Sequence, residues 1–97
     1  MSTKTEFRDY VLEMFRCLDG IVCKPMMGEY LLYYQGVLFG GIYDNRVLIK
    51  IVEANKKFGL SEELPYKGAK MMFMIEDLEN MELLQEIVKT TFDALKK

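Results

Sequence analysis

Side chains that could carry out acid-base or nucleophilic chemistry are few in this sequence. There is no histidine, and the candidates are Lys50, Glu29, Asp44 and the tyrosines. General acid-base catalysis needs a titrating group held close to a substrate, and the spacing pairs none of these residues. We expect Glu29 to be a solvated residue at the start of a strand. Lys50 is the best functional candidate, because it ends an apolar strand where its amine would be partly desolvated. The sequence therefore predicts no enzymatic activity.

Metal and phosphate sites are not expected either. Cys17 and Cys23 are the only cysteines, and two thiols without an imidazole do not fill a tetrahedral zinc site. The glycines at 28, 36, 40 and 41 are not followed by the helix start and Lys-Ser/Thr pair of a phosphate-binding loop. They are typical of turns and of a bulge, so we expect no cofactor and no metal.

The size and composition indicate a single domain spanning residues 1–97. Of the 97 residues, 51% are hydrophobic, which is enough for one core and too little for two. No apolar run reaches the ~18 residues that span a bilayer, and the N-terminus has no apolar signal region. We expect a cytoplasmic protein without a membrane segment, whose two thiols stay reduced.

The charge balance is slightly acidic. Thirteen basic and fifteen acidic residues give a net charge of -2. A protein that binds nucleic acid by itself usually has a clustered basic face. We therefore do not expect direct nucleic-acid binding.

The hydrophobic pattern predicts an α+β fold, in which an antiparallel β-meander carries an N-terminal and a C-terminal helix. Helical spacing predicts a helix over 5–18, with a capping box formed by Thr3 and Glu6, and a second helix that starts near Asn80. β-branched and aromatic residues predict strands over 30–34, 37–43 and 47–51, with two-residue turns at 35–36 and 44–45. A short edge strand over 23–26, a short helix over 52–58, a loop over 59–68 and an interior strand over 71–75 complete the prediction.

Pairing across two-residue turns assigns the side chains to two unlike faces of the sheet. One face is aliphatic, and we expect the helices to cover it; it carries Leu31, Tyr33, Leu38, Ile42, Val47, Ile49 and Ile51. The other mixes aromatic and charged residues, a composition that favours an interface. From this second face we select the binding candidates Tyr30, Tyr34, Phe39, Tyr43, Arg46 and Lys50. A three-residue turn at 44–46 would exchange the faces of the last strand.

The run from Lys24 to Lys50 resembles the core of the TfoX (Sxy) N-terminal domain family. The matching positions are Met26, Gly28, Tyr30, Tyr33, Gly36, Phe39 and Lys50, and the remaining elements follow in the order of that family. The sequence departs from the family at Met27, where Phe is common, and at 72–74, where the family is more aromatic. The resemblance implies an antiparallel α+β fold without catalytic activity and a regulatory role in natural competence. Founding members also carry a C-terminal domain, which has no counterpart up to Lys97.

Two functions remain open at this point. The first is a non-enzymatic interaction or regulatory module of the TfoX type, acting through a protein partner or as a homodimer. The second is a small-molecule-binding protein or small enzyme with its site at Lys50 and neighbouring tyrosines. A closed core with an exposed aromatic sheet face favours the first, and a concave polar cleft of about a few hundred cubic ångströms at Lys50 favours the second.

Overall fold

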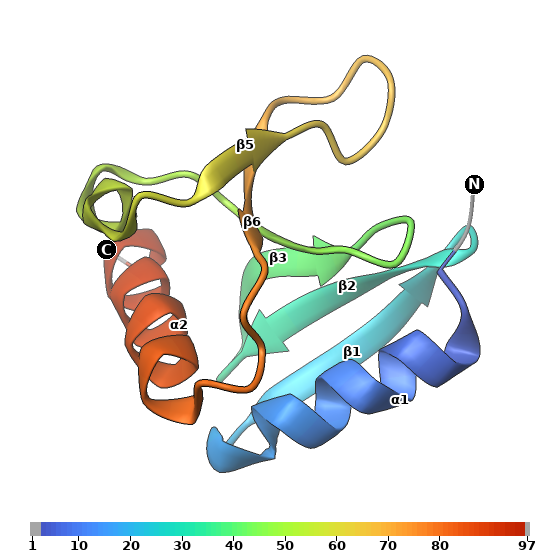
Figure 1. Ribbon diagram of the computed structural model, residues 1–97, viewed down its shortest axis with the longest axis horizontal. Coiled ribbons are helices and arrows are strands. Elements are labelled where there is room, and N and C mark those ends of the chain that lie inside the picture. Colours follow the sequence, from blue (N-terminus) through green and yellow to red (C-terminus); the bar gives the residue numbers. More distant parts are fainter. Residues whose placement is uncertain (1–2, 97) are drawn as a thin grey trace.

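The computed structural model describes residues 3–96 and has the predicted α+β architecture: one antiparallel sheet with an N-terminal and a C-terminal helix packed on it (Figure 1). The elements in chain order are α1 (Thr5–Met14), the 3-10 helix η1 (Phe15–Cys17), β1 (Ile21–Met26), β2 (Glu29–Tyr34), β3 (Val37–Ile42), β4 (Val47–Ile49), the 3-10 helix η2 (Glu53–Phe58), β5 (Ser61–Glu63), β6 (Met72–Ile75) and α2 (Met81–Leu95). The six strands are ordered β1-β2-β3-β4-β6-β5, and each pair is antiparallel.

Both helices cover the same face of the sheet, which we call the inner face. Val11 of α1, Phe15 of η1, and Leu84 and Ile87 of α2 are fully buried in one cluster with this face. The sheet contributes to that cluster Leu32, Tyr34, Phe39, Ile42, Val47, Ile49, Phe73 and Ile75. The opposite side, the outer face, carries the alternate residues Val22, Lys24, Leu31, Tyr33, Leu38, Leu48, Lys50, Met72 and Met74.

The two predicted turns are confirmed. Gln35 and Gly36 connect β2 to β3, with φ of 48° and 85°, and Asp44 and Asn45 connect β3 to β4, with φ of 52° and 58°. Positive φ at both central residues is the geometry of a type I′ turn, whose twist matches that of the flanking strands. The backbone groups of Tyr43 and Arg46 exchange two hydrogen bonds of 2.8 and 3.0 Å across the second turn. The three-residue turn considered above does not form.

The predicted face assignment is wrong for half of the meander, because β3 contains a bulge. Tyr33 pairs with Leu38, whereas Leu32 pairs with Gly40, so Phe39 is an extra residue. A one-residue shift in register moves the following side chains to the opposite face. Leu32 and Tyr34 therefore join Ile42, Val47 and Ile49 under the helices, while Leu31, Tyr33 and Leu38 lie on the outer face.

The paired glycines allow the backbones to approach closely at this bulge, as predicted. A Cβ at Gly40 would lie 2.2 Å from the carbonyl oxygen of Leu48. A Cβ at Gly41 would lie 2.6 Å from the carbonyl oxygen of Tyr30 and 2.7 Å from the Tyr43 ring. No residue with a side chain fits either position without moving a strand.

The first helix begins as predicted at Thr5, but the predicted capping box is wrong. Lys4 is the N-cap and makes no side-chain capping bond. The Thr3 hydroxyl instead donates to Glu29 Oε1 at 2.7 Å, and the Thr3 N–H donates to the Gly28 carbonyl at 3.0 Å. Thr3 therefore attaches the N-terminal segment to the sheet.

The second half of the chain differs from the prediction at one element. The short helix, the interior strand β6 and the Asn80 cap of α2, which accepts from the Leu83 N–H at 3.2 Å, are confirmed. Residues 61–63, predicted as loop, form β5 on the edge beside β6. The stretch Ser-Glu-Glu has no apolar residue, so hydrophobic patterning gave no signal for a strand.

Candidate functional site

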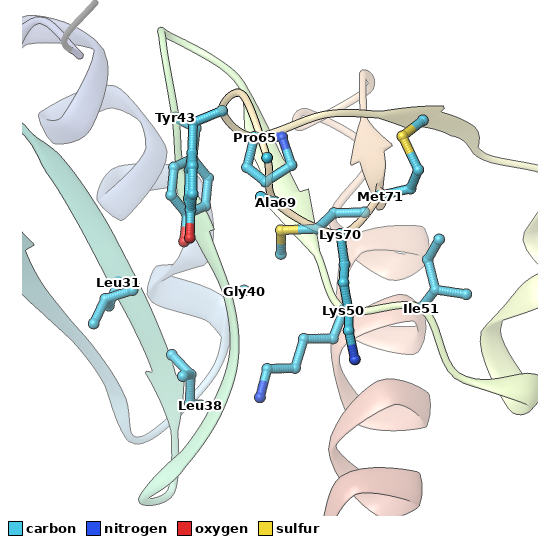
Figure 2. A pocket seen from close by; sticks show the side chains of 13 residues that line it. Leu31, Leu38, Gly40, Tyr43, Lys50, Ile51, Pro65, Ala69, Lys70 and Met71 are labelled. Carbon is cyan, nitrogen blue, oxygen red and sulfur yellow. The ribbon is translucent and has the colours of Figure 1, made fainter.

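A groove lies on the outer face, between the central strands and the segment that connects β5 to β6 (Figure 2). Its volume is about 720 Å³. One side is formed by Leu31, Leu38 and Gly40 of the central strands, and the other by residues of the 64–71 segment, including Pro65 and Ala69. The sequence kept a cleft at Lys50 and neighbouring tyrosines as an alternative, but it did not indicate the wall formed by the 64–71 segment, which has no periodic pattern.

Two lysines and two tyrosines provide the polar groups of the groove. Lys50 follows β4 and Lys70 precedes β6, and both side chains line the groove (Figure 2). The ring centroids of Tyr43 and Tyr66 are 6.1 Å apart. Among the described residues that line the groove, none is Asp, Glu, Cys, Ser or Thr. The groove is thus basic and apolar, without a carboxylate or thiol that could act beside the lysines.

Tyr43 has the most buried side chain among the polar residues that line the groove in the described part of the chain. Its side chain is 6% exposed, and its hydroxyl has no hydrogen-bond partner among residues 3–96. Burial raises the pKa of Tyr43 above its usual value of 10.0, and nearby Tyr66 and Glu29 raise the pKa further. At neutral pH the hydroxyl is therefore protonated and free to donate a hydrogen bond.

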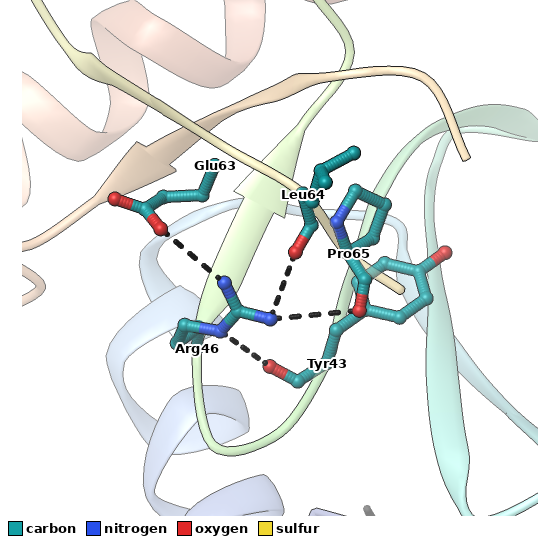
Figure 3. Close-up of polar contacts among 5 residues, drawn as sticks. All are labelled: Tyr43, Arg46, Glu63, Leu64 and Pro65. Carbon is teal, nitrogen blue, oxygen red and sulfur yellow. Dashed lines mark hydrogen bonds and ion pairs between the residues drawn. The ribbon is translucent and has the colours of Figure 1, made fainter. Parts of the chain in front are cut away.

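Arg46 attaches the 64–71 segment to the sheet (Figure 3). Its guanidinium donates to the carbonyl oxygens of Leu64 at 3.0 Å, Pro65 at 3.5 Å and Tyr43 at 3.2 Å. A carboxylate oxygen of Glu63 lies 3.5 Å from Nη1. A guanidinium has five N–H donors in a planar arrangement, so it can bind several acceptors at the same time. Arg46 therefore positions the groove, although it does not line it.

The six predicted binding residues are divided between three environments, so the predicted cluster is wrong. Tyr34 and Phe39 are buried under the helices, where Tyr34 packs edge-on against Phe92 at 5.0 Å and Phe39 against Phe15 at 6.1 Å. Tyr30 is also on the inner face, with the Arg8 guanidinium 5.3 Å from its ring centroid. Tyr43 and Lys50 line the groove, and Arg46 supports it. The bulge at Phe39 explains this division.

A buried polar cluster behind Lys50 also had no signal in the sequence. Asn55 of η2 is 0% exposed, and its amide donates to the Lys50 carbonyl and to the Thr91 hydroxyl, both at 2.9 Å. Its Oδ1 accepts from the Val52 N–H at 3.1 Å. These contacts join the end of β4 to η2 and α2 and so fix the backbone from which the Lys50 side chain extends.

Neither a membrane span nor a metal centre is found in the described part of the chain. No helix within residues 3–96 has the length and hydropathy needed to cross a bilayer. Over the same residues, no three Cys, Asp or Glu side chains gather in a way that could hold a metal ion.

Comparison with known proteins identifies a relative but no function. No family model matches the chain, and no solved structure matches it. None of these comparisons bears on the resemblance to the TfoX N-terminal domain, which stays a prediction. A protein of Spirochaeta aurantia, described as an uncharacterized 12.7 kDa protein in the trpE 5′ region, is 36% identical over 98 aligned residues. The alignment covers 98% of this chain and 85% of that protein. The chain therefore belongs to the same family as the 12.7 kDa protein of Spirochaeta aurantia.

Proposed function

We propose that this chain is a non-enzymatic interaction module that binds a protein partner through the outer face of its sheet. The observation that carries the proposal is the contrast between the two faces, since both helices pack on one side and leave the other without a helix. On that uncovered side Val22 is 47% exposed, and Tyr33 and Leu38 are partly exposed. Partly exposed apolar and aromatic side chains on one surface are typical of protein interfaces.

The charge of the outer face favours an acidic partner. Lys24, Lys50 and Lys70 lie on this side, and within residues 3–96 none has a carboxylate oxygen within 4.0 Å of its ammonium group. Acidic side chains predominate instead at the exposed positions of the helices, such as Glu13 and Glu86. Complementary charge selects partners and speeds their association. Two copies meeting through this basic face would repel each other, so a distinct acidic protein fits better than a homodimer.

The polar groups of the groove support a role without catalysis. Within residues 3–96, lysine and tyrosine are the only titratable residue types that line it, and general acid-base work usually pairs groups whose pKa values differ. The resemblance to the TfoX N-terminal domain adds a regulatory role in transcription or competence to the proposal. The two free cysteines fit a cytoplasmic location, where thiols stay reduced.

The partner can be located by chemical cross-linking. The tagged full-length protein is cross-linked through its lysines in a lysate of its source cells, and the linked peptides are identified by mass spectrometry. We expect one acidic protein to be linked through Lys24, Lys50 or Lys70, and its capture to fall in Lys24→Glu but not in the control Lys89→Glu on α2. Links through Lys89 or Lys57 alone, or equal capture by both variants, would contradict the proposal. A doubled mass in light scattering that Lys24→Glu abolishes would identify a second copy as the occupant.

The groove favours a second candidate, a small-molecule-binding protein with its site at Lys50 and the tyrosines. Its volume of about 720 Å³ falls within the roughly 300–1,000 Å³ of small-molecule sites. This candidate and the first are compatible, because Lys24 and Tyr33 lie on the outer face without lining the groove.

A further inference from the structure

The groove has a basic wall whose charge is not neutralised by the protein. Lys50 and Lys70 both line it, and no carboxylate within residues 3–96 lies within 4.0 Å of either ammonium group. Glu29, on the same side of the sheet, is already bound by the Thr3 hydroxyl at 2.7 Å and the Asp44 N–H at 3.1 Å. Two like charges beside an apolar surface are each stabilised when an anion is placed between them.

Tyr43 adds a hydroxyl donor to the groove that the two lysines line. Its side chain is 6% exposed, but within residues 3–96 no buried side-chain oxygen lacks a hydrogen-bond partner, so the hydroxyl is the accessible end of this side chain. The Tyr43 hydroxyl has no hydrogen-bond partner among the described residues, and Figure 2 shows it directed toward the space between Leu31 and Gly40. A polar atom of a ligand in the groove would satisfy it.

The remaining walls define the rest of the ligand. Leu31, Leu38 and Met72 present aliphatic surface, and Pro65 and Tyr66 lie on the other side. A small inorganic anion would leave this apolar surface without contacts. An aryl or acyl group would bury it, and each Å² of apolar surface removed from water stabilises the complex by about 25 cal/mol. The shape and lining therefore favour an amphipathic molecule over a simple ion.

We propose that the groove binds a small organic anion, with a carboxylate or phosphate between Lys50 and Lys70, an apolar body against Leu31 and Leu38, and a polar atom at the Tyr43 hydroxyl. This inference rests on the second candidate function and specifies its ligand class. It does not depend on a protein partner, which would use the surrounding outer face.

A matched pair of fluorescent probes tests the proposal. 1-Anilinonaphthalene-8-sulfonate has an aromatic body and an anionic group, and N-phenyl-1-naphthylamine has the same body without the charge. We expect saturable binding of one sulfonate probe per chain, at least about tenfold tighter than the neutral probe. In Lys50→Glu and in Lys70→Glu the affinity for the anionic probe falls about tenfold, which corresponds to roughly 1.4 kcal/mol, while the neutral probe is unaffected.

Control variants separate the site from general effects of charge or folding. Lys89→Glu removes one positive charge from α2 and leaves the affinity unchanged, and Tyr43→Phe weakens the anionic probe severalfold with an unchanged near-ultraviolet circular dichroism spectrum. Equal loss in Lys89→Glu, or equal affinity for the two probes, would overturn the proposal. Absence of saturable binding would do the same, while lysine cross-links to an acidic protein would still support the first function.

Native mass spectrometry of the protein purified from its source cells distinguishes the origin of the anion. A non-covalent adduct of small-molecule mass that is absent from Lys50→Glu supports the proposal. If the groove is filled only by a peptide segment of the cross-linked partner, the small-molecule assignment is wrong and the anionic group belongs to that partner.

Discussion

At the scale of single residues, Asn55 contributes more to stability than its place in a short 3-10 helix suggests. It is fully buried and bonds to Val52, Lys50 and Thr91. Asn55→Leu keeps the branched shape with the same number of side-chain heavy atoms, but it leaves the Val52 N–H and the Lys50 carbonyl without these partners. We expect it to lower the free energy of unfolding by about 2–4 kcal/mol, measured by urea denaturation. Exposed Lys56→Ala in the same helix is the control, and a change of similar size there would contradict this explanation.

Titration of Tyr43 is expected to lower the stability of the folded state at alkaline pH. Its folded-state pKa is raised, mainly by burial, so between the unfolded and folded pKa values the folded chain retains a proton that the unfolded chain loses. The contribution of Tyr43 to stability is therefore complete below about pH 10 and falls as the pH rises above it. In Tyr43→Phe this part of the fall should disappear, as measured by chemical denaturation between pH 8 and 11. Tyr10, whose pKa is raised by its hydrogen bond to Glu79, remains as a background in both proteins.

At the scale of elements, Gly40 permits the close approach of β3 and β4 beside the bulge. Because a Cβ there would meet the Leu48 carbonyl at 2.2 Å, Gly40→Ala must separate β3 from β4. We expect a loss of at least about 3 kcal/mol, seen as a large drop in the thermal midpoint. Gly36→Asn, in a turn where no atom lies within 4 Å of the added Cβ, should cost only about 1 kcal/mol. Equal effects would show that backbone conformation, and not strand contact, is what Gly40 provides.

Arg46 holds the 64–71 segment, which forms one side of the groove. Arg46→Lys keeps the positive charge but loses the fork that reaches the Leu64 and Pro65 carbonyls. Hydrogen exchange followed by mass spectrometry should be faster in peptides covering 64–71, with little change in α2, and stability should fall by about 1–2 kcal/mol. Arg16→Lys, in a surface pair with Glu13, should leave exchange in that segment unaffected.

The helices and strands were predictable from the sequence wherever a regular spacing of hydrophobic residues runs through the whole element. The helical stripe of α1, the strands of the meander and the apolar run of β6 follow directly from spacing. The paired glycines indicate a bulge or a close approach, but the exchange of faces does not follow from spacing, because the side chains alternate regularly on either side of Phe39 and only the extra residue exchanges the faces. The edge strand β5 and the bonds of Asn55 and Arg46 are tertiary, joining segments whose proximity no local pattern encodes. The full lining of the groove could therefore be identified only from the structure, although Lys50 and Tyr43 were among the candidates from the sequence.

At the scale of the whole molecule, two neighbouring residues test the division of the sheet into faces. Phe39 is fully buried against Phe15, whereas Leu38 is partly exposed on the outer face. Phe39→Ala should cost about 3–5 kcal/mol, and Leu38→Ala distinctly less, about 1–1.5 kcal/mol, in the same denaturation experiment. The reverse order would restore the face assignment derived from unbulged pairing.

The two ends of the sheet limit how the molecule can associate. A free strand edge offers unpaired N–H and carbonyl groups to any other copy that approaches. Here β1 contains Pro25, which has no N–H to donate, and β5 is only three residues long with two consecutive glutamates. Stacking a further chain at the β5 end would bring like charges together, so growth into fibrils is discouraged at the two places where a backbone ladder could continue. Concentrated samples of the protein should accordingly remain free of ordered aggregates, even though one face of the sheet has no helix over it.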